Sequence, residues 1–362
     1  MSSHPHLLSN VTLGALRLPN RVIMAPMTRN RARADGTVPP AYGEYFAQRS
    51  SAGLLITDAT MTSPQAVGYP NTPGLWTEEQ MESWRAVVNE VHAVGGLIAL
   101  QLMHCGRISL EAWQPDKAMP VSSSPVRAAT TMLRTPALAK GPAAEPRALE
   151  LNEMPGVVAQ FAQAARRGRE AGFDAVEIQA ADGYLIDQFL RDAVNRRHDR
   201  YGGSAENRSR FLLEVTEAVA KEFGADRTGV RLSPDGTYND MRDNAPLDTF
   251  GTALRQLAAL DLAWVHLGSM GDTDLCRRLR DVHGKPFMLN GDFTAESADA
   301  TIRSELAIAI SFGRAYIANP DLVERFEIDA PLNTPDPDTF HGGSAKGFTD
   351  YPLLQDVEIE EY

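Results

Sequence analysis

The sequence contains few cysteines, no long apolar run and no excess of positive charge. Its two cysteines among 362 residues, Cys105 and Cys276, are too few for the disulfide framework of a secreted protein, so a cytoplasmic location is expected. No segment has the length of a membrane span, and the first residues lack the pattern of a signal peptide. The net charge is 35 − 47 = −12, which argues against nucleic acid or an anionic membrane as a partner.

Several catalytic motifs are also missing. There is no G-x-S-x-G, no H-E-x-x-H and no G-x-x-x-x-G-K-[ST], and no G-x-G-x-x-G follows the first predicted strand. A serine hydrolase, a zinc hydrolase and a phosphate-loop nucleotide hydrolase are therefore not expected. No lysine lies at the carboxyl end of a predicted strand, which argues against a Schiff-base aldolase.

The sequence does contain eight short, β-branched apolar runs that alternate with longer amphipathic segments. Such runs are typical of parallel strands buried on both faces. They are Arg21–Met27, Gly53–Ala59, Leu97–Met103, Phe173–Ala180, Gly229–Ser233, Ala263–Gly268, Pro286–Gly291 and Ala307–Gly313. Eight strand–helix units predict an α/β fold, a (β/α)8 TIM barrel, as one domain over residues 1–362. An open, doubly wound sheet is the alternative, because it shows the same alternation.

Two segments depart from a minimal barrel. Residues 7–18 predict a short β-hairpin ahead of the first strand, placed to close the floor of the barrel. Residues 104–151 form a long excursion after the third strand, rich in Pro, Ser, Thr and Ala. A connection of that length predicts a lid over the site, the alternative being a disordered insertion.

The carboxyl ends of the strands are where a barrel of this kind builds its active site. Gly291 follows the seventh strand, and Gly313 and Arg314 follow the eighth. Glycine lets backbone N–H groups approach a phosphate and a guanidinium group clamps its oxygens, so these residues predict a phosphate site. Taken singly, either glycine is equally consistent with an ordinary turn.

Several stretches resemble one family in order and at barrel-compatible spacing. They are Arg21–Arg31, Gly68–Trp76, Gln101–Arg107, Gly183–Leu190, Arg200–Arg210, Ser311–Val323 and Phe340–Pro352. Over essentially its whole length the chain resembles the old yellow enzymes, which are FMN-dependent ene-reductases and NAD(P)H dehydrogenases. The resemblance implies noncovalent FMN across the barrel mouth, with NAD(P)H as co-substrate.

The resemblance also assigns roles to individual residues. The implied cofactor-binding residues are Pro26, Met27, Thr28, Ala59, Gln101, Arg231, Asn290, Gly291, Gly313 and Arg314. Among them, Thr28 is expected at flavin O4, Gln101 at the pyrimidine edge and Arg231 near N1 and O2. Tyr184 is the implied proton donor, and Tyr69 lines the substrate pocket. Thr28 and Gln101 could instead be ordinary strand-end residues, and Arg231 a member of an ion pair in the barrel wall.

One departure from the family pattern concerns the substrate. The family places His, and three positions later His or Asn, where this chain has Gln179 and Asp182. These family side chains donate hydrogen bonds to a substrate oxygen. Gln179 retains an NH2 donor, but an ionised Asp182 only accepts. At ~4 Å from a developing enolate it would cost about 4 kcal/mol at an effective dielectric near 20. It could instead bind a cationic or hydroxyl-bearing substrate, or serve as a general base.

Two further lining positions differ from the family. Met103 stands where Trp is frequent and His341 where Tyr is common, so a less aromatic pocket with an imidazole at its edge is expected. Neutral drift in a degenerate relative is the alternative reading of all these changes.

Three functions remain open on the sequence. The first is an FMN-dependent oxidoreductase that passes hydride from NAD(P)H to a specialised unsaturated small molecule. The second is a desaturase or isomerase that uses Asp182 or Tyr184 as base, and the third is a flavin-binding barrel without turnover. The sequence does not choose between NADPH and NADH, or between a monomer and a homodimer.

Overall fold

The computed structural model describes residues 3–135, 139–268 and 271–356. Eight parallel strands close into a barrel in chain order, and the last strand pairs with the first. Their bounds are β3 Val22–Met24, β4 Leu54–Met61, β5 Ile98–Met103, β10 Ala175–Gln179, β11 Thr228–Leu232, β12 Trp264–Leu267, β13 Phe287–Asn290 and β14 Ala307–Phe312. The predicted (β/α)8 barrel is confirmed, and its closure excludes the open sheet.

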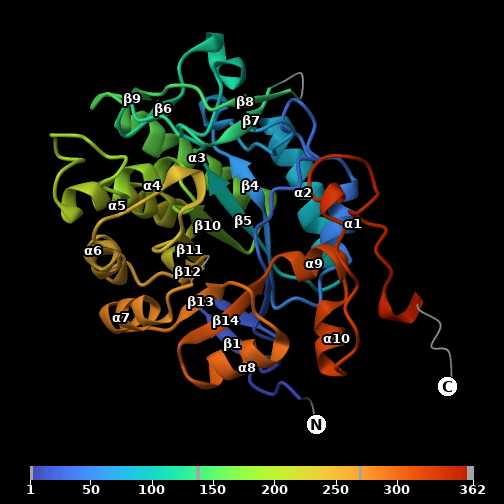
Figure 1. Ribbon diagram of the computed structural model, residues 1–362. Helices are drawn as coiled ribbons and strands as arrows, with labels where there is room; N and C mark the ends of the chain where they lie inside the picture. Colours follow the sequence, from blue (N-terminus) through green and yellow to red (C-terminus); the bar gives the residue numbers. More distant parts are fainter. Residues whose placement is uncertain (1–2, 136–138, 269–270, 357–362) are drawn as a thin grey trace.

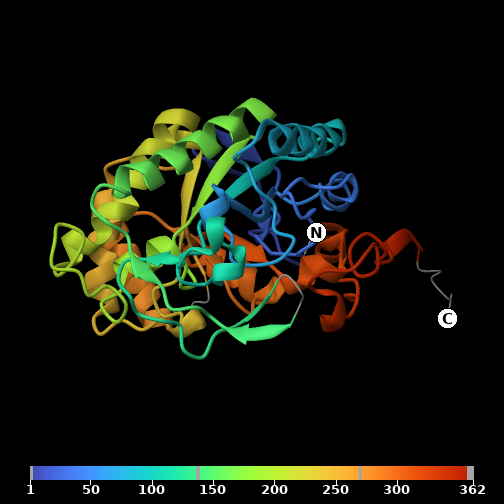
Figure 2. The same ribbon diagram turned by 90° about the horizontal axis from the view of Figure 1, so that it is seen from above.

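Helices form a ring outside the strands, which is clearest when the barrel is viewed from above (Figure 2). Their bounds are α1 Ala41–Ala47, α2 Glu78–Ala93, α3 Met154–Ala171, α4 Leu185–Leu190, α5 Ala205–Phe223, α6 Pro246–Ala258, α7 Thr273–His283, α8 Ala295–Arg303, α9 Arg314–Ala318 and α10 Leu322–Glu327. Local signals set several of these limits. Thr77 and Gln80 form a reciprocal capping box at α2, and Gly172 ends α3 at a φ of 100°.

The floor of the barrel is closed by the predicted hairpin. Strands β1 (Val11–Leu13) and β2 (Leu16–Leu18) pair antiparallel at the end opposite the excursion (Figure 1). Leu13, Leu16 and Leu18 pack against Ile23 and other inward-facing residues of the barrel strands. Burying these leucines removes the open lower end of the barrel from water.

The excursion lies at the other end of the barrel, where the arrowheads of β4 and β5 point (Figure 1). It contains a parallel pair, β6 (Val121–Ser122) with β9 (Arg147–Ala148), and an antiparallel hairpin, β7 (Met132–Arg134) with β8 (Lys140–Pro142). The excursion thus forms defined short strands beside the mouth, and its role as a lid stays a prediction. Within the described ranges, no helix has the length and apolar character needed to cross a bilayer.

Candidate active site at the mouth of the barrel

A buried polar network lies inside the barrel, directly beneath its mouth. The Glu177 carboxylate accepts hydrogen bonds from Gln101 Nε2 at 2.9 Å and from Trp264 Nε1 at 2.8 Å, and it lies 2.9 Å from His266 Nδ1. Burial opposes ionisation of Glu177, but hydrogen bonds from His266 and Trp264 and the charge of Arg231 outweigh it and lower the pKa of this carboxyl. Burial and the neighbouring guanidinium group lower the pKa of His266, so its ring is neutral and Nδ1–H donates to Glu177.

Arg231, at the carboxyl end of β11, connects this network to the mouth. Its Nη1 lies 2.8 Å from His266 Nε2, and its Nη2 donates to Asn290 Oδ1 at 3.1 Å. Its Nε lies 3.7 Å from Asp182 Oδ2, which forms an ion pair across the end of β10. The Arg231 side chain is only 8% exposed, so its charge is buried at the carboxyl end of β11, between His266, Asn290 and Asp182.

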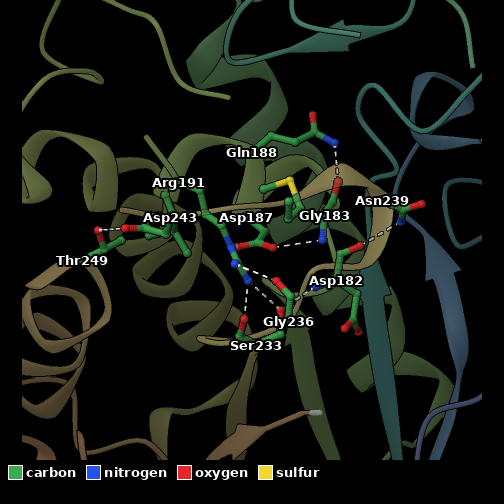
Figure 3. Close-up of polar contacts among 12 residues, drawn as sticks. Asp182, Gly183, Asp187, Gln188, Arg191, Ser233, Gly236, Asn239, Asp243 and Thr249 are labelled. Atoms are coloured by element: carbon green, nitrogen blue, oxygen red, sulfur yellow. Dashed lines mark hydrogen bonds and ion pairs between the residues drawn. The ribbon is translucent and has the colours of Figure 1, made fainter. Parts of the chain in front are cut away.

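The loop that carries Asp182 is fixed by its neighbours (Figure 3). Asp182 has a φ of 56°, a left-handed conformation that Asp tolerates better than most residues. Its backbone N–H donates to Ser233 Oγ at 2.8 Å, and its carbonyl accepts from Asn239 Nδ2 at 2.8 Å. The next N–H, that of Gly183, donates to Asp187, which forms a buried ion pair with Arg191 at 2.8 Å. The Asp182 carboxylate points away from that anchoring pair (Figure 3).

Gln179 and Asp182 contact each other. Gln179 Nε2 donates to Asp182 Oδ2 at 3.2 Å, while the buried Gln179 Oε1 has no hydrogen-bond partner within the described part of the chain. A carboxylate cannot donate, so the amide must turn its NH2 toward Asp182 and its oxygen away. Neither this contact nor the ion pair between Arg231 and Asp182 was predicted from the sequence.

A cavity of about 470 Å³ lies over this end of the barrel. Thr28, Tyr69, Tyr184 and His341 are among its lining residues, with Arg134 and Lys140 of the β7–β8 hairpin. Gln179, Asp182 and Met103 are not among the described residues that line it. Met103 is fully buried in an apolar cluster with Ala59 and Tyr184, so its place in the pocket stays a prediction.

Two tyrosines meet in the wall of this cavity. The hydroxyl oxygens of Tyr69 and Tyr184 lie 3.2 Å apart, and their rings stand edge to face with centroids 6.4 Å apart. Tyr184 lies at the start of α4, five residues beyond Gln179, the last residue of β10. Burial raises the pKa of both phenols well above the ordinary range of tyrosine, so both are protonated at neutral pH.

His341 reaches the cavity from the C-terminal segment. Its Nδ1–H donates to the Thr28 carbonyl at 3.0 Å, and partial burial with nearby guanidinium groups lowers its pKa below the ordinary value. Arg29 donates to the carbonyls of Phe340 and Gly347 and thereby anchors the segment. The imidazole at the edge of the pocket is therefore neutral near pH 7 and holds the strand-end segment that carries Thr28.

A second cavity, of about 530 Å³, opens at the ends of β13 and β14. Asn290, Gly291, Gly313 and Arg314, which the sequence singled out, all line it. Arg314 is exposed, with 78% of its side chain accessible, and lies 4.0 Å from the exposed Asp292. The four residues are thus brought together, and their role toward a phosphate stays a prediction.

The first two strand ends lie side by side. Pro26, Met27 and Thr28 follow β3, and Ala59 lies in β4 at a shift in the β4–β5 register. The two segments are joined by Asp58, which accepts from the backbone N–H of Arg29 at 2.7 Å. Burial raises the pKa of Asp58 to about 6. This bond fixes the backbone that the resemblance assigns to the flavin ring.

Sequence reasoning missed Glu177 and His266. Both are polar residues inside otherwise apolar barrel strands, AVEIQ and WVHL, and both are fully buried. Charged residues are almost never fully buried unless paired, so such interruptions were the available signal. Their partners come from strands far apart in the chain, which a single sequence does not reveal.

Comparison with known proteins gives consistent matches over the whole chain. Residues 6–333 match the model of the NADH:flavin oxidoreductase / NADH oxidase family. A putative 12-oxophytodienoate reductase 11 of Oryza sativa subsp. japonica is 41% identical over 366 residues, covering 98% of this chain and 99% of that protein. Morphinone reductase superimposes with a TM-score of 0.94 at 43% identity, covering 98% of both chains. A structure of morphinone reductase in complex with tetrahydroNAD superimposes with a TM-score of 0.93 at 44% identity, covering 97% of this chain and 98% of that one.

Proposed function

The chain belongs to the NADH:flavin oxidoreductase / NADH oxidase family, the old yellow enzymes, and we propose that its Tyr184 delivers the proton that completes reduction of a carbon–carbon double bond. The protein is an FMN-dependent NAD(P)H oxidoreductase that acts on unsaturated substrates. The observation that carries the proposal is the buried, protonated Tyr184 in the wall of the 470 Å³ cavity at the barrel mouth.

The residues at the mouth fit FMN. Glycine backbone and Arg314 border a cavity at the ends of β13 and β14, which suits a phosphate. Arg231 and Gln101 place a cation and an amide at the top of the barrel, where the flavin edge needs hydrogen-bond partners. The buried, unpartnered Gln179 Oε1 is a further polar atom that lacks a ligand. When bound, FMN accepts a hydride from NAD(P)H and passes it to one carbon of the substrate double bond.

The protein groups then complete the reaction. Tyr184 O–H protonates the second carbon of the double bond, and the adjacent Tyr69 hydroxyl stabilises the tyrosinate that results. Because burial keeps Tyr184 protonated, it suits an acid better than a base. Asp182 is already engaged by Arg231 and Gln179, which opposes its use as a free general base. The geometry therefore favours reduction over desaturation or isomerisation.

An anaerobic titration tests this function. FMN-loaded protein should lose its flavin absorbance on addition of one equivalent of NADPH or NADH. Reoxidation should follow with a member of a panel of enones, nitro compounds and quinones. A flavin that neither coenzyme reduces would mean that the barrel binds FMN without turnover.

Truncation of Arg314 tests the phosphate site. We expect Arg314→Ala to weaken FMN binding by about 1–2 kcal/mol, or roughly five- to thirtyfold, which suits an exposed charge-assisted hydrogen bond. Arg278→Ala is the matched control, because Arg278 is another exposed arginine, on α7, that lines neither cavity. The measurement is the dissociation constant of FMN from reconstituted apoprotein. Equal constants for the two variants would remove Arg314 from the site.

A further inference from the structure

Gln179 and Asp182, at and just after the end of β10, together offer more free hydrogen-bond acceptors than donors. Gln179 is 5% exposed, and its Nε2 is committed to Asp182. Its Oε1 is buried and has no partner within the described ranges. The orientation of the amide is fixed by its neighbour, since a carboxylate accepts and never donates. A buried amide oxygen left without a donor destabilises the protein, and a ligand that donates to it would remove that cost.

Asp182 presents a second acceptor. Arg231 and Gln179 both address Oδ2, at 3.7 and 3.2 Å. Oδ1 accepts no hydrogen bond from the residues that the structure describes, and 20% of the Asp182 side chain is exposed. Ser233 and Asn239 hold the backbone of Asp182, and Gln179 and Arg231 hold its carboxylate through Oδ2. The free oxygen therefore stands at a fixed place beside the mouth.

We infer that Gln179 Oε1 and Asp182 Oδ1 form an acceptor site, which selects substrates that donate a hydrogen bond from nitrogen over substrates that offer a carbonyl oxygen. This inference rests on the proposed function. It assigns the substrate class as compounds whose double bond is conjugated to a protonated imine or amidine. The nicotinamide coenzyme remains compatible with the site, because its carboxamide carries an NH2 group that can donate to the same two oxygens.

The reaction balances for a protonated, conjugated imine. The hydride, supplied by NAD(P)H through the flavin, adds to the β-carbon of the double bond. The π electron pair moves to form a bond between the α-carbon and the imine carbon, and the C=N⁺ bond becomes the single bond of a neutral enamine. Tyr184 then gives its proton to the α-carbon, which restores C=N⁺ and leaves a tyrosinate that solvent reprotonates. Asp182 contributes by favouring the protonated imine, the form that accepts hydride.

Four ligands that share a phenyl ring but differ in their polar group distinguish binding to hydrogen-bond acceptors from simple attraction of a cation. Benzamidinium only donates, benzamide donates and accepts, and acetophenone and benzoate only accept. We expect oxidised, FMN-loaded protein to bind benzamidinium at least about tenfold more tightly than acetophenone, with benzoate weakest. Dissociation constants are measured from the flavin difference spectrum, which reports only ligands that bind beside the flavin. The measurement is made at two ionic strengths, because a net charge of −12 attracts any cation.

Two variants with the same change in net charge complete the experiment. Asp182→Asn should weaken benzamidinium binding at least about tenfold and strengthen acetophenone binding. Asparagine also adopts the left-handed backbone of this position readily, so the loop should be retained. Asp281→Asn, near the end of α7 and in a cavity that Val11 of the floor hairpin also lines, should leave the ratio unchanged.

The outcomes distinguish this inference from the proposed function. If acetophenone binds as tightly as benzamidinium, or if both variants shift the ratio equally, the acceptor site is wrong even though NAD(P)H still reduces the flavin. If neither coenzyme reduces the flavin, the proposed function itself fails. If the ratio holds and only Asp182→Asn abolishes it, the acceptor site stands.

Discussion

The double variant Gln179→His, Asp182→Asn should reduce 2-cyclohexenone at least about a hundredfold faster than the wild-type protein. Each hydrogen-bond donor aimed at a developing oxyanion is typically worth about 10²–10³ in rate, or roughly 2.7–4 kcal/mol. In the inferred acceptor site the wild-type chain offers no such donor, because the Gln179 NH2 group donates to Asp182. The relevant measurement is the rate at which cyclohexenone reoxidises reduced flavin, followed anaerobically in a stopped-flow instrument.

Asp182→Asn alone should supply most of this gain. It removes a carboxylate that would oppose a developing enolate by about 4 kcal/mol at ~4 Å and an effective dielectric near 20, before Arg231 offsets part of that charge. Asparagine keeps one oxygen that can accept from Gln179 but adds an NH2 group, so the pair of amides gains a donor for the substrate. The effects of the two substitutions on the rate should be non-additive, because the two side chains contact each other and are proposed to face the same substrate oxygen.

A third variant, Asp281→Asn, is the control for these substitutions. Asp281→Asn changes the net charge equally at the far end of the barrel and should leave cyclohexenone reduction unaltered. If the wild-type protein already reduces cyclohexenone at a rate that the double variant does not exceed, Gln179 and Asp182 do not face the substrate oxygen. The family assignment and the flavin would be untouched by that result.

The fold was predictable because separate signals in the sequence agree with one another. Eight apolar runs of strand length, a capping box at Thr77 and a left-handed glycine at Gly172 all agree with the barrel that the structure contains. The hairpin over 7–18 was predictable for a similar reason, since Leu13, Leu16 and Leu18 need an apolar surface and the barrel floor supplies one.

The site was predictable in its positions but not in its contacts. Tyr184, Tyr69 and His341 were named from the sequence and line one cavity. The ion pair between Arg231 and Asp182 depends on the register that sets Gln179 opposite Arg231, and on the left-handed backbone at Asp182. Neither can be derived from residue types. Asp182 was therefore expected as an isolated carboxylate, whereas its Oδ2 atom is engaged and only one oxygen remains free.

Substitution of Tyr184, the proposed proton donor, should separate the two half-reactions. We expect Tyr184→Phe to slow reduction of a carbon–carbon double bond by about 10²–10⁴, the usual contribution of a positioned general acid. Reduction of the flavin by NAD(P)H should stay within about twofold of the wild-type rate, because hydride transfer to the flavin needs no proton from this phenol. Tyr69→Phe should cost far less, since it removes only the neighbour at 3.2 Å.

The choice of oxidant and pH makes this test of Tyr184 specific. A quinone takes up its protons on oxygen, from water, so Tyr184→Phe should reduce quinones at nearly the wild-type rate while it fails on carbon–carbon double bonds. Burial raises the pKa of Tyr184 well above the ordinary range, so the wild-type rate should show no loss of this acid between pH 6 and pH 9. A phenylalanine variant that keeps more than a tenth of the wild-type activity on the double bond would show that the proton comes from elsewhere, with Tyr69 the nearest candidate in the cavity wall.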